Sequence, residues 1–145
     1  MRKLAIAIDG PAGAGKSSVA KILAANMGYA YLDTGAMYRA VTYEVLRQEL
    51  TEEKDIVALA AGMDMTVKPE TDAMHVIVNG HDVTDHIRTP EVSARVSAVS
   101  ALAGVRAAMV EIQRRQAAKG GIVLDGRDIG TTVLPHADVK IFQSE

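Results

Sequence analysis

The stretch IAIDGPAGAGKSS, residues 6–18, constrains the fold more than any other part of the chain. It begins in a continuous apolar run, Leu4–Ile8, which is typical of a strand buried on both faces. Residues 10–17 then match the pattern G-x-x-x-x-G-K-[ST] in full. Glycines in such a loop let successive backbone N–H groups turn toward an anion, and a following helix adds its positive N-terminus. The stretch therefore predicts a strand, a phosphate-binding loop and a helix.

A loop of this kind binds a nucleoside triphosphate together with Mg²⁺. Lys16 can reach the β- and γ-phosphates, and the Ser17 hydroxyl can bind the metal ion. The expected ATP-binding residues are Gly10, Pro11, Ala12, Gly13, Ala14, Gly15, Lys16, Ser17 and Ser18. GTPases, ATPases and small-molecule kinases share the loop, so it does not identify the reaction. The sequence contains no Asn-Lys-x-Asp element of the kind that a GTPase uses to select its base.

Helices are expected over much of the chain. Their predicted ranges are 16–27, 36–50, a segment capped by Thr51, and 90 to about 117 with a break near Gly104. Val19, Ile22 and Leu23 share one face of the first helix, and Gly28 is expected to end it. Thr89 is the expected N-cap of the last one, because a proline at the first helical position follows it.

Strands alternate with these helices, except in one segment. Further buried strands are expected over 29–32, 122–125 and 137–142, which predicts an α/β fold with a mostly parallel sheet. Around residues 63–67 and 74–78 apolar and polar side chains alternate instead, and Asn79-Gly80 marks a two-residue hairpin. This segment is therefore predicted to be a small antiparallel insert.

The composition excludes several classes of protein. A chain of 145 residues with 48% hydrophobic residues can form one domain with a real core. A net charge of −2 and only five aromatic rings argue against a nucleic-acid polymer as partner. The absence of cysteine excludes disulfides and fits a reducing, cytoplasmic location. We expect no membrane segment and no signal peptide, and the four histidines show no metal-ligand spacing.

Polar residues gather where three of the predicted strands end, at residues 9–18, 33–39 and 125–128. Ligands of parallel sheets bind at this edge. A kinase needs fixed cations there, and Arg39 and Arg127 can each bind a terminal phosphate in a bidentate manner. Either arginine could instead form a surface ion pair, but their positions at strand ends favour the phosphate. Asp125, with Asp33 as a second candidate, could hold Mg²⁺ through water or could cap a helix.

Four segments together resemble the bacterial cytidylate kinases: AIDGPAGAGKSS, YLDTGAMYRAV, DHIRTPEVS and LDGRDIGTTVLPHADVKIF. The likeness extends from residue 1 to about 142. Many families share the loop, whereas DTGAMYR and DGRDIGT are far more specific. The resemblance implies a P-loop kinase core over residues 1–145, with strand order 2-3-1-4. It also implies that an insert at about 62–100 forms the monophosphate-binding region.

The resemblance further implies Mg²⁺-dependent transfer of the γ-phosphoryl group of ATP to CMP or dCMP, giving CDP or dCDP. The implied catalytic residues are Lys16, Arg39 and Arg127, and the implied metal-binding residues are Ser17 and Asp125. The implied acceptor-binding residues are Thr34, Arg39, Ser97, Arg106, Arg127 and Asp128. In that set Ser97, Arg106 and Asp128 would bind the edge of the cytosine base, whose amino group donates and whose N3 and O2 accept.

Other interpretations of these residues stay open. Without the resemblance, Arg106 would be a solvated surface residue, Ser97 a helix-packing residue and Asp128 a partner of Arg127. A kinase for UMP, AMP or another acceptor would use the same loop. Members of the family also continue past residue 142 with an arginine-bearing lid, a fifth strand and a terminal helix. A nucleotide-binding module with little or no turnover is therefore a second hypothesis, and we expect the full-length protein to be a monomer.

Overall fold

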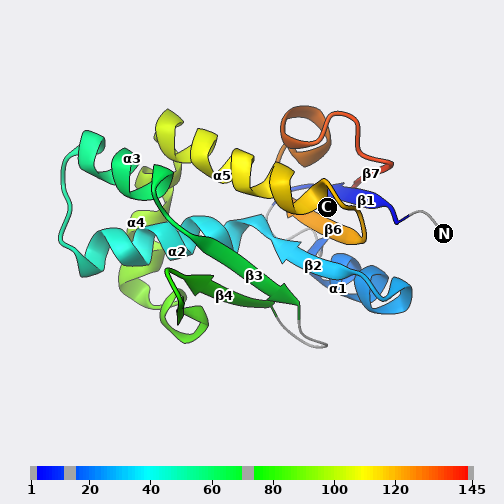
Figure 1. The fold of residues 1–145 in the computed structure, drawn as a ribbon, viewed down its shortest axis with the longest axis horizontal. Coiled ribbons are helices and arrows are strands. Elements are labelled where there is room, and N and C mark those ends of the chain that lie inside the picture. Colours follow the sequence, from blue (N-terminus) through cyan, green and yellow to red (C-terminus); the bar gives the residue numbers. More distant parts are fainter. Residues whose placement is uncertain (1–2, 12–15, 70–73, 144–145) are drawn as a thin grey trace. The chain divides into compact units, whose positions relative to one another are not determined.

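The computed structural model describes residues 3–11, 16–69 and 74–143, and it divides into two compact units (Figure 1). The sheet unit comprises Met1–Thr34, Pro69–Met74 and Gln113–Glu145. The helical unit comprises Gly35–Lys68 and His75–Ile112. The boundaries fall inside two helices, α2 (Thr34–Arg47) and α5 (Ala103–Ala117), so each of these helices contributes residues to both units.

The sheet unit is built on four parallel strands. They are β1 (Ala5–Asp9), β2 (Ala30–Asp33), β6 (Ile122–Gly126) and β7 (Val139–Phe142), in the spatial order β2-β6-β1-β7. Counted along the chain, this is the order 2-3-1-4. The predicted α/β class, parallel sheet and strand order are therefore confirmed.

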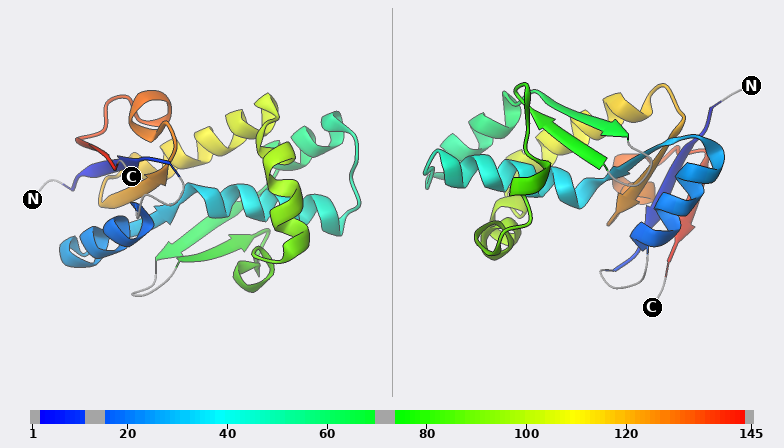
Figure 2. Two further views of the ribbon diagram at one scale, coloured as in Figure 1. Left: turned by 180° about the vertical axis from the view of Figure 1, so that it is seen from behind. Right: turned by 90° about the horizontal axis from the view of Figure 1, so that it is seen from below.

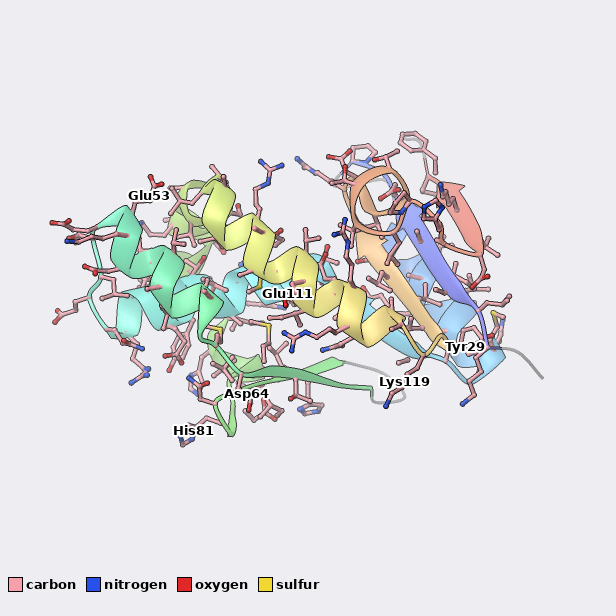
Figure 3. All side chains as sticks on the ribbon, turned by 45° about the horizontal axis from the view of Figure 1, so that its top comes forward. Tyr29, Glu53, Asp64, His81, Glu111 and Lys119 are labelled. Atoms are coloured by element: carbon pink, nitrogen blue, oxygen red, sulfur yellow. The ribbon has the colours of Figure 1, made fainter. Side chains whose placement is uncertain are left out.

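The centre of this sheet is the pair of strands β1 and β6. Ile6 lies opposite Val123 and Ala7 opposite Leu124. All four side chains are buried, as is Ile8. A strand covered on both faces needs apolar residues at successive positions, which explains why the run before the glycine-rich loop does not alternate. At the amino end of the sheet the Leu4 amide donates to the Tyr29 hydroxyl at 2.9 Å (Figure 3).

Helix α1 (Lys16–Met27) runs along this sheet (Figure 2). The expected apolar face is not the buried one. Ala20 and Ala24 are buried, whereas Val19 is 37% and Ile22 63% exposed. Lys21 reaches toward β2, since its Nζ lies 5.9 Å from the centre of the Tyr31 ring.

The end of α1 follows the prediction. Gly28 has a left-handed φ of 67°, and the Tyr29 amide donates to the Ala24 carbonyl at 2.9 Å. A glycine in this conformation satisfies carbonyls of the last helical turn, because it lacks the Cβ that would clash. Strand β2 then starts two residues later.

Strand β7 forms one edge of the sheet. Within the described part of the chain it pairs with β1 alone, on one side. Val139 is 36% and Phe142 73% exposed. Of the two edge strands in the described sheet, β2 and β7, the strand β7 therefore carries exposed large apolar side chains.

Helices make up most of the helical unit. Besides its parts of α2 and α5, it contains α3 (Glu53–Ala61) and α4 (Pro90–Ser100). Met37, Val41 and Val45 of α2 are completely buried, as their spacing predicts. The cap expected at Thr51 is wrong: α3 begins at Glu53, after an extended Glu52 that makes no side-chain cap bond.

The caps and breaks of α4 and α5 are partly as expected. The Thr89 hydroxyl accepts from the Val92 amide at 3.3 Å, which confirms it as the N-cap of α4. The predicted break near Gly104 is confirmed and falls at residues 101–102. Gly104 lies inside α5, where a Cβ would come within 2.5 Å of a Val57 methyl group. Its small size lets α5 approach α3.

A small three-stranded sheet has the order β3 (Met65–Pro69), β4 (Met74–Val78) and β5 (His81–Asp82). Strands β4 and β5 are antiparallel, and the connecting residues Asn79 and Gly80 have φ of 50° and 86°. Two consecutive left-handed residues form the predicted tight hairpin.

A hydrogen-bonded carboxylate closes this hairpin. Asp82 accepts from the Thr84 hydroxyl at 2.6 Å and from the Thr84 amide at 2.9 Å, and its other oxygen lies 2.8 Å from His75 Nδ1. These partners, the Thr84 hydroxyl first, lower the pKa of Asp82 to about 2. The exposed His81 is on the same hairpin (Figure 3). No group of three His, Cys, Asp or Glu within the described ranges is arranged to hold a metal ion.

In the described residues no single helix is long and apolar enough to cross a membrane. Helices α4 and α5 meet the length and composition criteria only when taken together, and they are bent by 97°.

Replacing Gly120 by alanine is expected to destabilise the protein more than replacing Gly28. Both glycines are left-handed, with φ of 71° and 67°, so each alanine costs about 1–2 kcal/mol. A Cβ at Gly120 would also collide with the Lys3 carbonyl oxygen, whereas a Cβ at Gly28 meets no atom within 4 Å. Urea unfolding followed by circular dichroism measures both free energies. Equal losses would show that the Lys3 backbone moves aside at no cost.

Candidate active site

The carboxyl ends of the parallel strands place three acidic residues at one edge of the sheet. Asp33 at the end of β2 is in register with Asp125 of β6, and Asp9 at the end of β1 is in register with Gly126. Asp9 is also in register with Phe142 at the end of β7. This edge is where a parallel sheet binds its ligands.

Asp125 is the most buried of these acids, with 2% of its surface exposed. Its Oδ2 accepts a hydrogen bond from the Tyr31 hydroxyl at 2.8 Å. The hydroxyl of Thr34 donates to the Asp125 carbonyl oxygen at 2.9 Å. Thr34 is itself buried at the first position of α2. The start of α2 is thereby joined to the end of β6.

The phosphate-loop prediction lies only partly within the described residues. Gly10 and Pro11 follow β1, and α1 begins at Lys16, so the required strand–loop–helix context is present. Residues 12–15 and the side chains of Lys16 and Ser17 lie outside the described part. Ser18 is exposed on the first turn of α1. The backbone N–H groups of that turn are free of intrahelical partners and can hold an anion.

A hollow of about 400 Å³ lies beside the start of this loop. It is lined by Asp9, Gly10, Pro11, Arg127, Asp128, Thr131 and Phe142. Arg127 and Asp128 are both exposed, in the turn that follows β6. Asp128 has a left-handed backbone with φ of 60° and ψ of 27°. The structure therefore brings two of the expected acceptor-binding residues next to the expected ATP loop.

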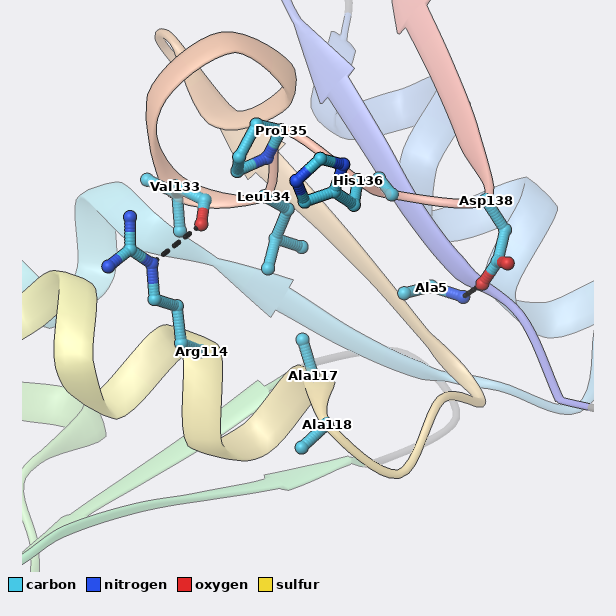
Figure 4. Close-up of a pocket in the computed structure, with 10 residues that line it drawn as sticks. Ala5, Arg114, Ala117, Ala118, Val133, Leu134, Pro135, His136 and Asp138 are labelled. Carbon is cyan, nitrogen blue, oxygen red and sulfur yellow. Dashed lines mark hydrogen bonds between the residues drawn. The ribbon is translucent and has the colours of Figure 1, made fainter.

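A second hollow, of about 450 Å³, lies elsewhere in the sheet unit (Figure 4). It is lined by Ala5 and Asp138, near the amino ends of β1 and β7, and by the segment 133–137. The guanidinium of Arg114 at its rim donates to the carbonyl of Val133 at 2.8 Å. None of the residues expected to bind nucleotide lines it. The hollow at the carboxyl ends is therefore the candidate site.

The remaining acceptor-side residues belong to the helical unit. Arg39 of α2 donates through Nη1 to the Ser93 hydroxyl at 3.0 Å and to the Ile87 carbonyl at 3.3 Å. Ser97 is exposed on α4, one helical turn beyond Ser93 and so on the same face. The guanidinium of Arg39, which reaches from α2, therefore contacts the same face of α4 that carries Ser97.

Arg106 on α5 is exposed, and its charge affects the pKa of Tyr38, a residue that the sequence pattern does not single out. Burial raises the pKa of Tyr38, and the positive charge of Arg106 partly offsets that effect. Tyr38 directly precedes Arg39 in α2. Tyr38 therefore lies close enough to Arg106, one of the expected acceptor-binding residues, to feel its charge, but one tyrosine in a helix gives no signal in a sequence.

The oxygen atoms that the protein offers fit a magnesium ion that is bound mainly by the phosphates of the nucleotide. The chain offers the Ser17 hydroxyl and the carboxylate of Asp125, both oxygen donors. Mg²⁺ prefers oxygen ligands, keeps several waters and is usually bound by one or two protein groups together with phosphate oxygens. A hydrogen-bonded, buried carboxylate suits a contact through water better than direct ligation.

Two further residues at this site escaped the sequence analysis. The sequence pattern marks Asp9 only as the point where the first strand ends. It marks Phe142 only as the end of the last strand, whereas the structure places this exposed ring in the lining of the hollow. An acidic residue directly before the glycine-rich loop is the one signal that could have drawn attention to Asp9.

Comparison with known proteins gives one consistent result. The family model "Cytidylate kinase" matches residues 6–144. The cytidylate kinase of Desulfitobacterium hafniense is 52% identical over 143 residues, which are 97% of this chain and 61% of that protein. The cytidylate kinases of Bacillus subtilis and Enterococcus faecalis are 52% and 51% identical, and 64% of each is covered. The chain therefore spans less than two thirds of the length of these relatives.

Substituting alanine for Arg106 should raise the pKa of Tyr38 further. A nearby positive charge favours the tyrosinate, so its removal leaves only the effect of burial. The shift can be followed by NMR of protein labelled with ¹³C at the tyrosine Cζ, titrated from neutral to alkaline pH. Arg95→Ala on α4 is the matched control and should leave this pKa unchanged. An unchanged pKa in Arg106→Ala would mean that the two side chains do not interact.

Proposed function

The chain belongs to the cytidylate kinase family, and from this premise we propose that it binds Mg·ATP and transfers the γ-phosphoryl group to the 5′-phosphate of CMP or dCMP. The observation that carries the proposal is the hollow at the carboxyl edge of the sheet. There the start of the phosphate loop and the exposed Arg127 and Asp128 line one cavity. Donor and acceptor phosphates must meet in such a place for in-line transfer.

On the ATP side, backbone N–H groups within residues 10–18, with the exception of Pro11, bind the phosphates. The start of α1 supports this role, because a helix N-terminus attracts anions. Lys16 binds the β- and γ-phosphates and stays with the phosphoryl group as it moves. Ser17, and Asp125 through water, would hold the magnesium ion. When bound, the ion neutralises charge on the phosphates.

On the acceptor side, Arg39 and Arg127 bind the phosphate of CMP and stabilise the transferring group. Thr34 contributes at the start of α2, where its hydrogen bond to Asp125 supports a fixed position. Planar guanidinium groups suit this task, since they bind phosphate oxygens in pairs and remain charged at any physiological pH.

The base is selected by Ser97, Arg106 and Asp128. The carboxylate of Asp128 accepts from the cytosine amino group, while Arg106 and Ser97 donate to N3 and O2. Uracil has a carbonyl oxygen where cytosine has the amino group. A carboxylate facing that oxygen is left without a donor, so UMP is rejected.

The proposal is tested by phosphoryl transfer from γ-labelled Mg·ATP to CMP, dCMP, UMP and AMP, with nucleotide binding measured in parallel. We expect transfer to CMP and dCMP only, and none in Lys16→Ala. Equal transfer to UMP or AMP would contradict the assigned acceptor. Binding of ATP without any transfer would instead support the alternative, a nucleotide-binding module with little or no turnover.

Replacing Asp128 by asparagine should change the base preference. Asparagine tolerates the left-handed backbone at this position, and its amide can donate to the uracil O4 as well as accept. We expect the preference for CMP over UMP to fall by about tenfold or more, the value of one buried polar contact. The ratio of kcat/KM for the two nucleotides measures it. Glu53→Asn, an exposed acid on α3, is the control, and an unaltered ratio in Asp128→Asn would remove Asp128 from the base site.

A further inference from the structure

Asp9 makes two hydrogen bonds at the candidate site to residues far away in the chain. Its Oδ1 accepts from the Ile129 amide at 2.5 Å, and its Oδ2 accepts from the Gly130 amide at 2.8 Å. The partners are 120 and 121 residues away along the chain. A carboxylate that accepts from two successive backbone amides forms charge-assisted bonds, which are stronger than bonds between neutral groups.

The two amides open the short helical turn η2 (Ile129–Val133). The first N–H groups of a helical turn have no partner within it and are normally satisfied by the side chain of the preceding residue. That residue is Asp128, a preferred N-cap type, yet its side chain makes no cap bond. Asp9 therefore caps η2 from a different strand, and the carboxylate of Asp128 is not used for this purpose.

The contact is closely packed. A Cβ added to Gly130 would lie 3.2 Å from Asp9 Oδ2 and 3.2 Å from the Lys140 side chain, so a larger residue would press on the carboxylate. The Asp9 carbonyl in turn accepts from the Gln143 amide at 2.7 Å. One residue thereby fastens the end of β1 to the turn after β6 and to the end of β7.

We propose that Asp9 is a positioning residue for the acceptor base. By capping η2 it holds the turn of residues 126–128 against the start of the phosphate loop and leaves the Asp128 carboxylate available to the substrate. This role rests on the proposed function, in which Asp128 binds cytosine. Asp9 acts through the backbone of Ile129 and Gly130, because both of its carboxylate oxygens accept from these amides.

The test is Asp9→Asn in the 145-residue chain. The amide keeps the shape of the side chain but has one acceptor oxygen, and its NH₂ group faces a backbone N–H. Asp138→Asn is the matched control. The Asp138 carboxylate accepts from the Ala5 amide at 2.8 Å, so it fastens the opposite end of the same strand (Figure 4).

The first readout needs no nucleotide. Amide hydrogen exchange measured by NMR should become at least about tenfold faster at Ile129 and Gly130 in Asp9→Asn, the loss expected for one charge-assisted bond. Exchange at these two amides should not change in Asp138→Asn. Unchanged exchange in Asp9→Asn would overturn the proposal, because the carboxylate would then not hold the turn.

The second readout is nucleotide binding by calorimetry. In Asp9→Asn the affinity for CMP should fall about tenfold and the preference over UMP should shrink. The affinity for ATP should not fall, since the change removes a negative charge next to its phosphates. Asp138→Asn should keep its CMP affinity within about twofold of the unchanged chain. This should hold even if urea unfolding shows that Asp138→Asn loses as much stability as Asp9→Asn. Equal losses of CMP affinity in both variants would reduce Asp9 to a structural role.

The two proposals fail in different ways. If the unchanged chain binds no CMP, the proposed function is wrong and the base-positioning role of Asp9 falls with it, while faster exchange in Asp9→Asn would still show the cap. If the unchanged chain binds CMP selectively and Asp9→Asn does so equally well, the proposed function stands and the positioning role is wrong.

Discussion

The parallel pairing of β1 with β6 is the interaction on which the sheet unit depends. It buries six apolar side chains of the two strands at the centre of the sheet and pairs their last residues, Asp9 and Gly126, with each other. Because both strands run in the same direction, the segments that leave them emerge at the same edge. The phosphate loop and the turn with Arg127 and Asp128 are therefore neighbours in space, although more than a hundred residues separate them in the chain. Asp9 then fixes the two segments to each other.

Much of this arrangement follows from local sequence. A continuous apolar run must be covered on both faces, so Leu4–Ile8 and the segment from Ile122 could be assigned to central strands. A tight two-residue hairpin needs two left-handed residues, and the pair Asn79-Gly80 adopts this conformation readily. The strand order followed from the family resemblance and not from these local patterns.

What escaped prediction depends on contacts between distant segments. In α1 the alanines face the sheet, because small residues let the helix lie close to it, while the larger Val19 and Ile22 stay exposed. Nothing local distinguishes this from the reverse arrangement. The same holds for Asp9, which resembles any acid before a glycine until Ile129 and Gly130 are placed beside it. The roles assigned to Ser97 and Arg106 came from the resemblance, and they stay predictions.

The free edge of β7 has a consequence for the behaviour of this chain at high concentration. An unpaired strand offers its amides and carbonyls to any other strand, and with Val139 and Phe142 exposed it invites self-association. Lys140, exposed between Val139 and Ile141, is the kind of charge that opposes such pairing. Dissolved salt screens that charge. Salt is therefore expected to weaken the protection that the charge of Lys140 gives to this edge of the described sheet.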